Sequence, residues 1–151
     1  MAVAVTALIW TGAAGAVKSP SLNRDESSLL AVMNQVRTVQ GLPALRIDRR
    51  LERAARGHSS EMLRTGTFAH GAFAARIRRV GVRSARIGEN LAWGVGALSR
   101  ARAIVNAWLA SPEHRANLLY PGYRLVGVGA LRGTFSGYRS ALMVTTDFAG
   151  T

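Results

Sequence analysis

The sequence predicts one domain of the α+β class. Apolar residues recur with the period of a helix between residues 24 and 118, and two apolar runs typical of strands follow them. The length of 151 residues is enough for one domain with a hydrophobic core and too little for two ordinary domains. We therefore divide the chain into an apolar export segment (1–17), a linker (18–23) and the domain itself (24–150).

The first helix is predicted over residues 24–40. Asn23 lies three residues before Glu26, which is the spacing of a capping box, and Gly41 follows the last apolar position of the pattern. Residues 42–45 contain a proline, and the residue before a proline avoids the helical conformation. We therefore expect this stretch to be a short extended connection.

The second helix is predicted between Asp48, a capping residue, and Gly66, a residue type that ends helices. Helical spacing of apolar residues also predicts a short third helix within residues 71–80. The glycine-bounded residues 87–93 indicate a turn or the edge of a sheet. One face of the second helix carries four residues that are expected to be buried: Leu51, Ala55, His58 and Met62.

Two further helices and a hairpin complete the predicted domain. Ser99 is expected to cap a fourth helix, and Ser111, followed by proline, to cap a short fifth one. Residues 125–131 and 141–148 have the composition of strands. The intervening residues 132–139, which include two glycines, predict a hairpin loop.

The composition limits the function classes. A chain that is 48% hydrophobic and 19% charged is neither a disordered tail nor a membrane bundle, and the absence of cysteine excludes disulfides and thiolate chemistry. The formal net charge of +12 predicts attraction to polyanions, although a merely solvated basic surface is the alternative. Nucleic acid is disfavoured as a partner, because the arginines are scattered and no aromatic residues interleave with them.

Residues 1–17 predict export. They are almost wholly apolar or small, but they are short for a membrane span, which needs about 20 apolar residues. The pattern fits the apolar core of a signal peptide, and residues 14–16 offer small side chains for cleavage, although no basic residue precedes the run. An uncleaved arm packed on the domain is the alternative. We expect the protein to be extracellular or in the cell envelope.

Three histidines and one glutamate are candidates for chemistry. His58 lies on the apolar face of the second helix, so we expect a hydrogen-bonded core residue. His70 follows the end of that helix, Glu89 lies between glycine and asparagine, and His114 opens the fifth helix. Two imidazoles and one carboxylate are the minimum for an open catalytic zinc site, but spacing alone does not bring them together. The sequence contains no HExxH motif, no phosphate-binding loop and no GxSxG elbow.

Short motifs between residues 29 and 148 resemble the CAP superfamily of cysteine-rich secretory proteins, antigen 5 and plant pathogenesis-related proteins, in its cysteine-free bacterial form. In chain order the motifs are LAVMNQVR with GLPAL, AARGHSSEM, FAH, GENLA, WLASPEHRANLL, and GVG with TDF. The resemblance implies an α–β–α sandwich with a central antiparallel sheet and a surface cleft. His70 and His114 match the two cleft histidines and Glu89 the glutamate of the GEN motif, whereas Ser111 replaces a glutamate that animal members carry.

The resemblance implies a secreted binding module. We expect a monomeric, non-enzymatic protein whose cleft contains His70, Glu89, Asn90 and His114 and takes a small, lipid or sterol-like ligand, while its basic surface binds anionic envelope material. Zinc or another divalent metal is the candidate cofactor, with His70 and His114 as its ligands. A peptidase-like hydrolase is the alternative, in which Glu89 would activate the metal-bound water. In a purely structural alternative, Glu89 accepts hydrogen bonds from both histidines.

Overall fold

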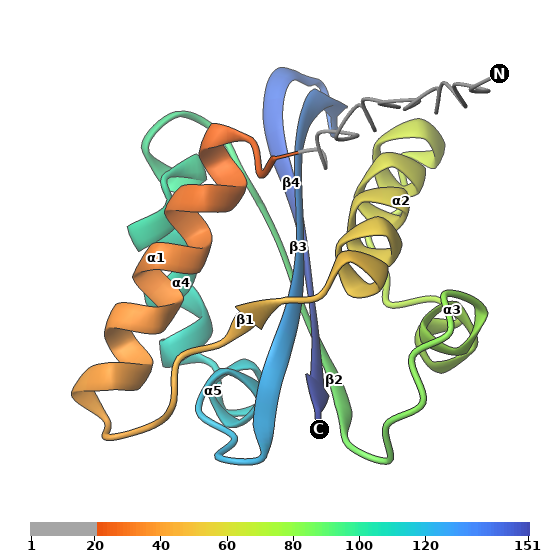
Figure 1. Ribbon diagram of the computed structural model, residues 1–151. Helices are drawn as coiled ribbons and strands as arrows, with labels where there is room; N and C mark the ends of the chain where they lie inside the picture. The colour runs from red at the N-terminus through yellow and green to blue at the C-terminus, as the bar shows by residue number, and fades with distance from the viewer. Residues whose placement is uncertain (1–20) are drawn as a thin grey trace, which may run out of the picture.

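A four-stranded sheet forms the middle layer of the computed structural model, which describes residues 21–151 (Figure 1). The strand order is β1-β3-β4-β2, and β2 pairs antiparallel with β4, as β4 does with β3. The short β1 pairs parallel with β3, so the sheet is mixed and not purely antiparallel as expected. The strands are β1 (Arg46–Ile47), β2 (Ile87–Gly94), β3 (Tyr123–Phe135) and β4 (Tyr138–Gly150).

Helices cover both faces of this sheet, which confirms the α+β class and the α–β–α sandwich (Figure 1). The helices α1, α4 and α5 lie on one face, and α2 and α3 lie on the other. No helix of residues 21–151 is both long enough and apolar enough to cross a membrane. The helices are α1 (Arg24–Val39), α2 (Arg49–Thr65), α3 (Phe73–Arg79), α4 (Ala101–Ala110) and α5 (Pro112–Leu118).

The first two helices begin and end as their capping residues predict. The side chain of Asn23 accepts from the backbone N–H of Glu26, whose own carboxylate accepts from the N–H of Asn23. Asp48 accepts from the first turn of α2, and Gly66 ends that helix with a φ of 66°. The predicted export segment, 1–17, and residues 18–20 of the linker lie outside the described residues.

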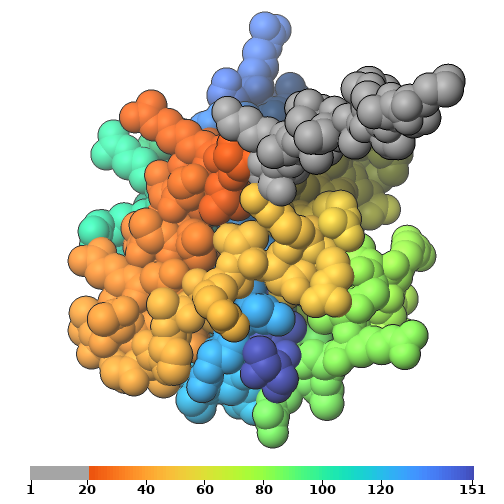
Figure 2. All heavy atoms as spheres, viewed as in Figure 1, coloured from red at the N-terminus to blue at the C-terminus, as the bar shows by residue number. Residues whose placement is uncertain are grey.

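Two local predictions were wrong. Ser99 does not cap α4: its hydroxyl donates to the carbonyl of Gly96 within a 3-10 turn, and Arg100 occupies the capping position. The predicted hairpin loop 132–139 is mostly strand, with Ser136 and Gly137 at positive φ between β3 and β4. Packing extends the strands, because the ring of Phe135 lies edge-on to Trp93 at 5.1 Å. Figure 2 shows the tip of this hairpin projecting from the body.

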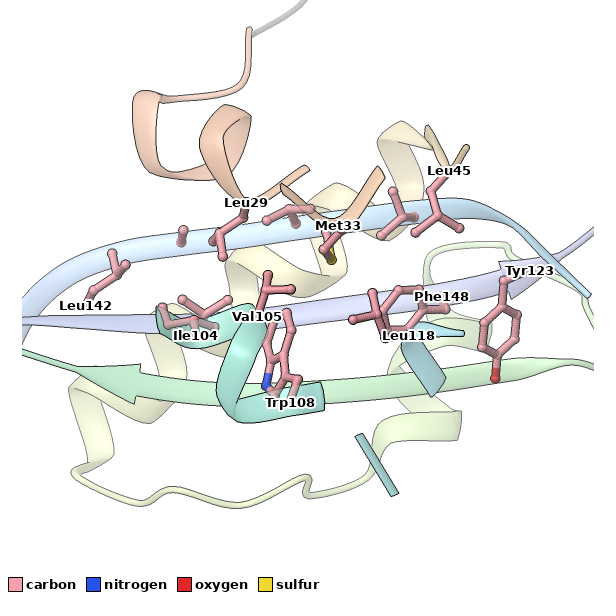
Figure 3. Packing of buried hydrophobic residues seen from close by; sticks show 14 residues of the cluster. Leu29, Met33, Leu45, Ile104, Val105, Trp108, Leu118, Tyr123, Leu142 and Phe148 are labelled. Carbon is pink, nitrogen blue, oxygen red and sulfur yellow. The ribbon is translucent and has the colours of Figure 1, made fainter. Parts of the chain in front are cut away.

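The main core lies between α1, α4 and the sheet (Figure 3). Trp108 is its largest side chain, and the indole N–H donates to the carbonyl of Leu91 on β2 at 2.9 Å. Truncation of a buried tryptophan to alanine costs about 3–5 kcal/mol, so this residue contributes strongly to the free energy of unfolding. The position of β2, an edge strand, is therefore fixed from this face.

Two glycines of β3 let α2 lie directly on the other face of the sheet. A Cβ atom on Gly127 would lie 2.1 Å from the carbonyl carbon of Leu51, and one on Gly129 would lie 2.3 Å from that of Ala55. No side chain fits in this space, so glycine is required for the close approach. The helix and the loop that follows it are thereby held at a fixed distance from the sheet.

A fully buried arginine ties α1 to the segment after α5. The guanidinium of Arg37 donates to four backbone carbonyls, one before β1 and three in the later segment: Pro43, Leu118, Tyr120 and Tyr123. Burial, and then the charge of Arg124, lower the pKa of Arg37. These hydrogen bonds satisfy a fully buried cation and anchor the chain near the end of α5, including the carbonyl of the fully buried Leu118.

Candidate functional site

A buried carboxylate holds an exposed imidazole at the edge of the sheet. Oε1 of Glu89, on β2, lies 2.7 Å from Nδ1 of His70, which lies in the loop between α2 and α3. The side chain of Glu89 is 2% exposed and that of His70 is 57% exposed. Since a carboxylate can only accept, Nδ1 carries the proton, and Nε2 is left for other partners.

Arg76, on α3, supports this pair from behind. Its guanidinium forms an ion pair with Oε2 of Glu89 and also donates to the backbone carbonyl of His70 at 3.3 Å. Both oxygens of Glu89 are thus engaged. In the sequence, the only sign of this role is the position of Arg76 three residues after Phe73, which places it beside the apolar side of a short helix.

His114 approaches the same region from α5. Its Nδ1 lies 2.8 Å from the hydroxyl of Ser111, the residue that replaces the glutamate of the resemblance, so Ser111 does not cap α5 through its side chain. Burial lowers the pKa of His114, the charge of His70 lowers it further, and Glu113 opposes both effects. The neutral imidazole of His114 is therefore favoured, and the effect of the His70 charge places the two histidines in the same region.

Asparagine side chains join α5 to β2. Nδ2 of Asn90 donates to the backbone carbonyl of His114 at 2.9 Å. Nδ2 of Asn117 lies 3.1 Å from both the carbonyl of Glu89 and the side-chain oxygen of Asn90. Asn90 is fully buried, so its amide fixes backbone and is not itself exposed to a ligand.

Asp147, in the TDF motif, is a further titratable residue beside Glu89 that was not among the predicted site residues. It lies on β4 directly opposite Glu89, it is fully buried, and neither of its oxygens has a hydrogen-bond donor among the described residues. Burial and the charge of Glu89 raise the pKa of Asp147 well above its usual value, and Arg76 offsets part of this increase. An acidic residue within the otherwise apolar or uncharged residues 140–150 was the available signal.

The described residues contain no three-ligand metal set, and the two expected ligands, His70 and His114, would need others to complete a site. Within residues 21–151, no group of three or more histidine, aspartate and glutamate side chains is placed to hold a metal ion. Glu89 is engaged by His70 and Arg76, which leaves only the two imidazoles as donors. Of the two histidines, His70 contacts Glu89, whereas Nδ1 of His114 contacts Ser111, so Glu89 does not accept from both as the structural alternative required.

The third histidine behaves as a core residue, as predicted. His58 is 4% exposed, and its Nε2 lies 2.9 Å from the carbonyl oxygen of Ala69. This contact holds the loop that leads to His70 against α2. His58 therefore supports the position of His70 but does not share its site.

A family model described as the cysteine-rich secretory protein family, CAP, matches residues 30–148. The YkwD protein of Bacillus subtilis (strain 168) is 32% identical over 114 residues, which are 72% of this chain and 43% of that protein. The membrane protein YlbC of the same organism is 32% identical over 112 residues, which are 71% of this chain and 32% of that protein. The chain thus spans less than half the length of these relatives.

Solved structures share the fold. An extracellular protein of Bacillus anthracis that contains an SCP domain superposes with a TM-score of 0.70 and 26% identity, covering 88% of this chain and 45% of that one. An outer surface protein of Borrelia burgdorferi gives a TM-score of 0.69 and 24% identity, covering 84% of this chain and 93% of that one. The names of these two proteins place them outside the cell or on its surface.

Proposed function

Because this chain belongs to the cysteine-rich secretory protein (CAP) family, we propose that it is a non-enzymatic binding module of the extracellular space or the cell envelope. The extracellular and surface locations in the names of its structural neighbours support export. The apolar residues 1–17 are consistent with an export signal. The proposal has two parts. The first is a ligand site formed by His70, Glu89 and His114, which we call the histidine site. The second is a basic surface that binds anionic envelope material.

The observation that carries the first part is the contrast in exposure between His70 and Glu89. A ring that is 57% exposed is oriented by a carboxylate that is 2% exposed, so Nε2 of His70 is held ready for a ligand. His114 adds a second, mainly neutral imidazole. The site suits a small polar ligand with hydrogen-bond donors, or a zinc ion bound by the two imidazoles and completed by oxygens that the protein does not supply.

No observation favours the hydrolase alternative. A general base needs a free carboxylate oxygen within reach of the water it activates. Both oxygens of Glu89 are engaged, one by His70 and one by Arg76. Glu89 is better described as a residue that positions His70.

The second part of the proposal depends on charge. Carboxylates pair with only some of the arginines, so the surface of residues 21–151 retains a large excess of exposed cations. Anionic lipid headgroups and acidic wall polymers share the negative charge that such a surface attracts. The paired arginines are Arg49, Arg50, Arg56, Arg76 and Arg132.

A calorimetric zinc titration tests the histidine site. Metal-free wild type is compared with His70→Ala, His114→Ala and the control Glu113→Gln, which alters a charge beside His114 but none of the three site residues. Stoichiometric zinc binding by the wild type and the control, together with its loss in both histidine variants, would support a zinc site at His70 and His114. If neither the wild type nor any variant binds zinc, the proposed metal site is wrong, and a polar organic ligand is the remaining candidate.

Vesicle cosedimentation tests the basic surface. The protein should sediment with phosphatidylglycerol vesicles and not with phosphatidylcholine vesicles, and the bound fraction should fall as salt is added, since salt screens exposed charges. Binding to both lipids alike, unaffected by salt, would contradict the charge argument and indicate an apolar lipid interaction. An acidic wall polymer in place of the vesicles distinguishes the two sources of negative charge.

A further inference from the structure

A cavity lies beside His70 and Glu89, on the other side of Arg76. Its volume is about 320 Å³, and it is bounded by α2, the loop that follows α2, and α3. Figures 1 and 2 show α3 beside α2 on the face of the sheet opposite α1. None of His70, Glu89 and His114 lines this cavity. Cavities that bind small molecules begin at about 300 Å³, so this one suits a ligand of few atoms.

Two guanidinium groups, those of Arg76 and Arg79, supply positive charge and hydrogen-bond donors to one part of the cavity wall. Arg79 is exposed and has no ion pair or hydrogen bond within residues 21–151. Arg76 also lines the cavity; its terminal nitrogens are engaged by Glu89 and His70, but its Nε–H is buried and has no acceptor in the described part of the chain. A free cation beside an unsatisfied donor favours an oxyanion, for which arginine has the matching geometry.

Acceptor groups also line the cavity. His58 donates from Nε2 to the carbonyl of Ala69, and in this tautomer Nδ1 carries a lone pair. That Nδ1 is buried without a hydrogen bond, and Oε2 of Glu61 lies 3.7 Å from it. Two neighbouring acceptors favour a ligand that carries a hydroxyl or an ammonium group. Met62 and Ala69 supply apolar wall.

We propose that this cavity binds a small hydroxy- or amino-carboxylate. The carboxylate contacts Arg79 and the Nε–H of Arg76, and the hydroxyl or ammonium group donates to Glu61 and His58. This site is additional to the histidine site and does not depend on a ligand there. The ligand class follows from the pairing of cationic donors with acceptors in one small space.

A nuclear magnetic resonance titration with three matched compounds tests this inference. Propionate, lactate and alanine have the same carbon skeleton and carboxylate, but only lactate and alanine carry the additional donor. Each is added at constant ionic strength to wild type, Arg79→Gln and Arg78→Gln, and backbone amide shifts are recorded. Arg78 is the matched control, because it is a neighbouring exposed arginine of α3 that does not line the cavity.

Lactate or alanine should shift amides of α2, α3 and the loop between them in wild type and in Arg78→Gln, with at least a tenfold loss of affinity in Arg79→Gln. His114→Ala should bind as wild type does, which separates this result from the fate of the histidine site. Absence of shifts, or equal binding by Arg79→Gln and wild type, would overturn the proposal. Binding of propionate as tightly as lactate and alanine would overturn the role of Glu61 and His58.

Discussion

Glu89 and Asp147 lie directly opposite each other on β2 and β4, and both carboxyl groups are buried. Like charges in this arrangement destabilise a sheet. Arg76 pairs with Glu89, whereas Asp147 has no donor among the described residues. Burial and the charge of Glu89 raise the pKa of Asp147, which favours its protonated form and would relieve the repulsion.

Replacement of Asp147 by asparagine should change how stability depends on pH. The raised pKa means that the native state keeps a proton that the unfolded state releases above its own pKa of about 3.9. The stability that this proton gives is complete below that pKa and is lost as pH rises through the higher native pKa. Asp147→Asn should therefore gain stability relative to wild type as pH rises from about 4 to 8, measured by urea unfolding. Parallel pH profiles would show that Asp147 is ionised in the native state.

Removal of the Glu89 carboxylate should change the tautomer of His70 without unfolding the domain. In the wild type the neutral ring carries its proton on Nδ1, because the carboxylate accepts there. In Glu89→Ala that acceptor is lost, so the proton should move largely to Nε2. The ring ¹⁵N shifts of His70 report this directly, and the ring shifts of His58, which does not contact Glu89, provide the internal control. Unchanged His70 shifts would show that Glu89 does not orient the ring.

Replacement of Arg37 should be among the most destabilising changes in the domain. Arg37→Met keeps the apolar stem but removes the hydrogen bonds to four backbone carbonyls, so we expect a loss of about 3 kcal/mol or more in the free energy of unfolding. Arg37→Lys should recover little, because one ammonium group cannot reproduce the spread of the guanidinium. Chemical denaturation measures both. A loss below about 1 kcal/mol for Arg37→Met would mean that water replaces the guanidinium.

Replacement by alanine should lower the free energy of unfolding much more at Gly127 than at Gly133, although both glycines lie on β3. Gly127→Ala would place Cβ 2.1 Å from a backbone atom of Leu51, which cannot move without shifting α2, so we expect a loss of about 3 kcal/mol or more. Gly133→Ala is the matched control on the same strand. Its Cβ would meet only the side chain of Leu63 at 3.1 Å, which can change rotamer, so we expect a loss below about 1 kcal/mol. Equal thermal midpoints for the two variants would contradict the close packing of α2 on β3.

The elements that follow local rules could be predicted from the sequence, and the contacts between distant elements could not. The caps at Asn23, Asp48 and Gly66 fix helix ends through neighbouring residues, so α1 and α2 were predicted within a residue. The ends of β3 and β4 depend instead on the packing of Phe135 against Trp93, which no local pattern encodes.

The same division holds for the candidate site. His70 and Glu89 were chosen through a family resemblance, and their contact follows from the place of β2 at the edge of the sheet. The pairing of Glu89 with Arg76, and its opposition to Asp147, depend on tertiary packing and strand register. The spacing of residues along the sequence cannot reveal that both oxygens of Glu89 are engaged, or that Asp147 lies beside it.

The order of the strands also affects when the domain can form. The strands β3 and β4 occupy the centre of the sheet, yet they follow every helix in the sequence. During synthesis, the apolar faces of α1, α2 and α4 therefore leave the ribosome before the surface on which they pack exists. Folding as a unit must wait until residues near Phe148 have emerged. Until then these apolar faces have no sheet to pack on, which is the kind of exposed surface that chaperones recognise.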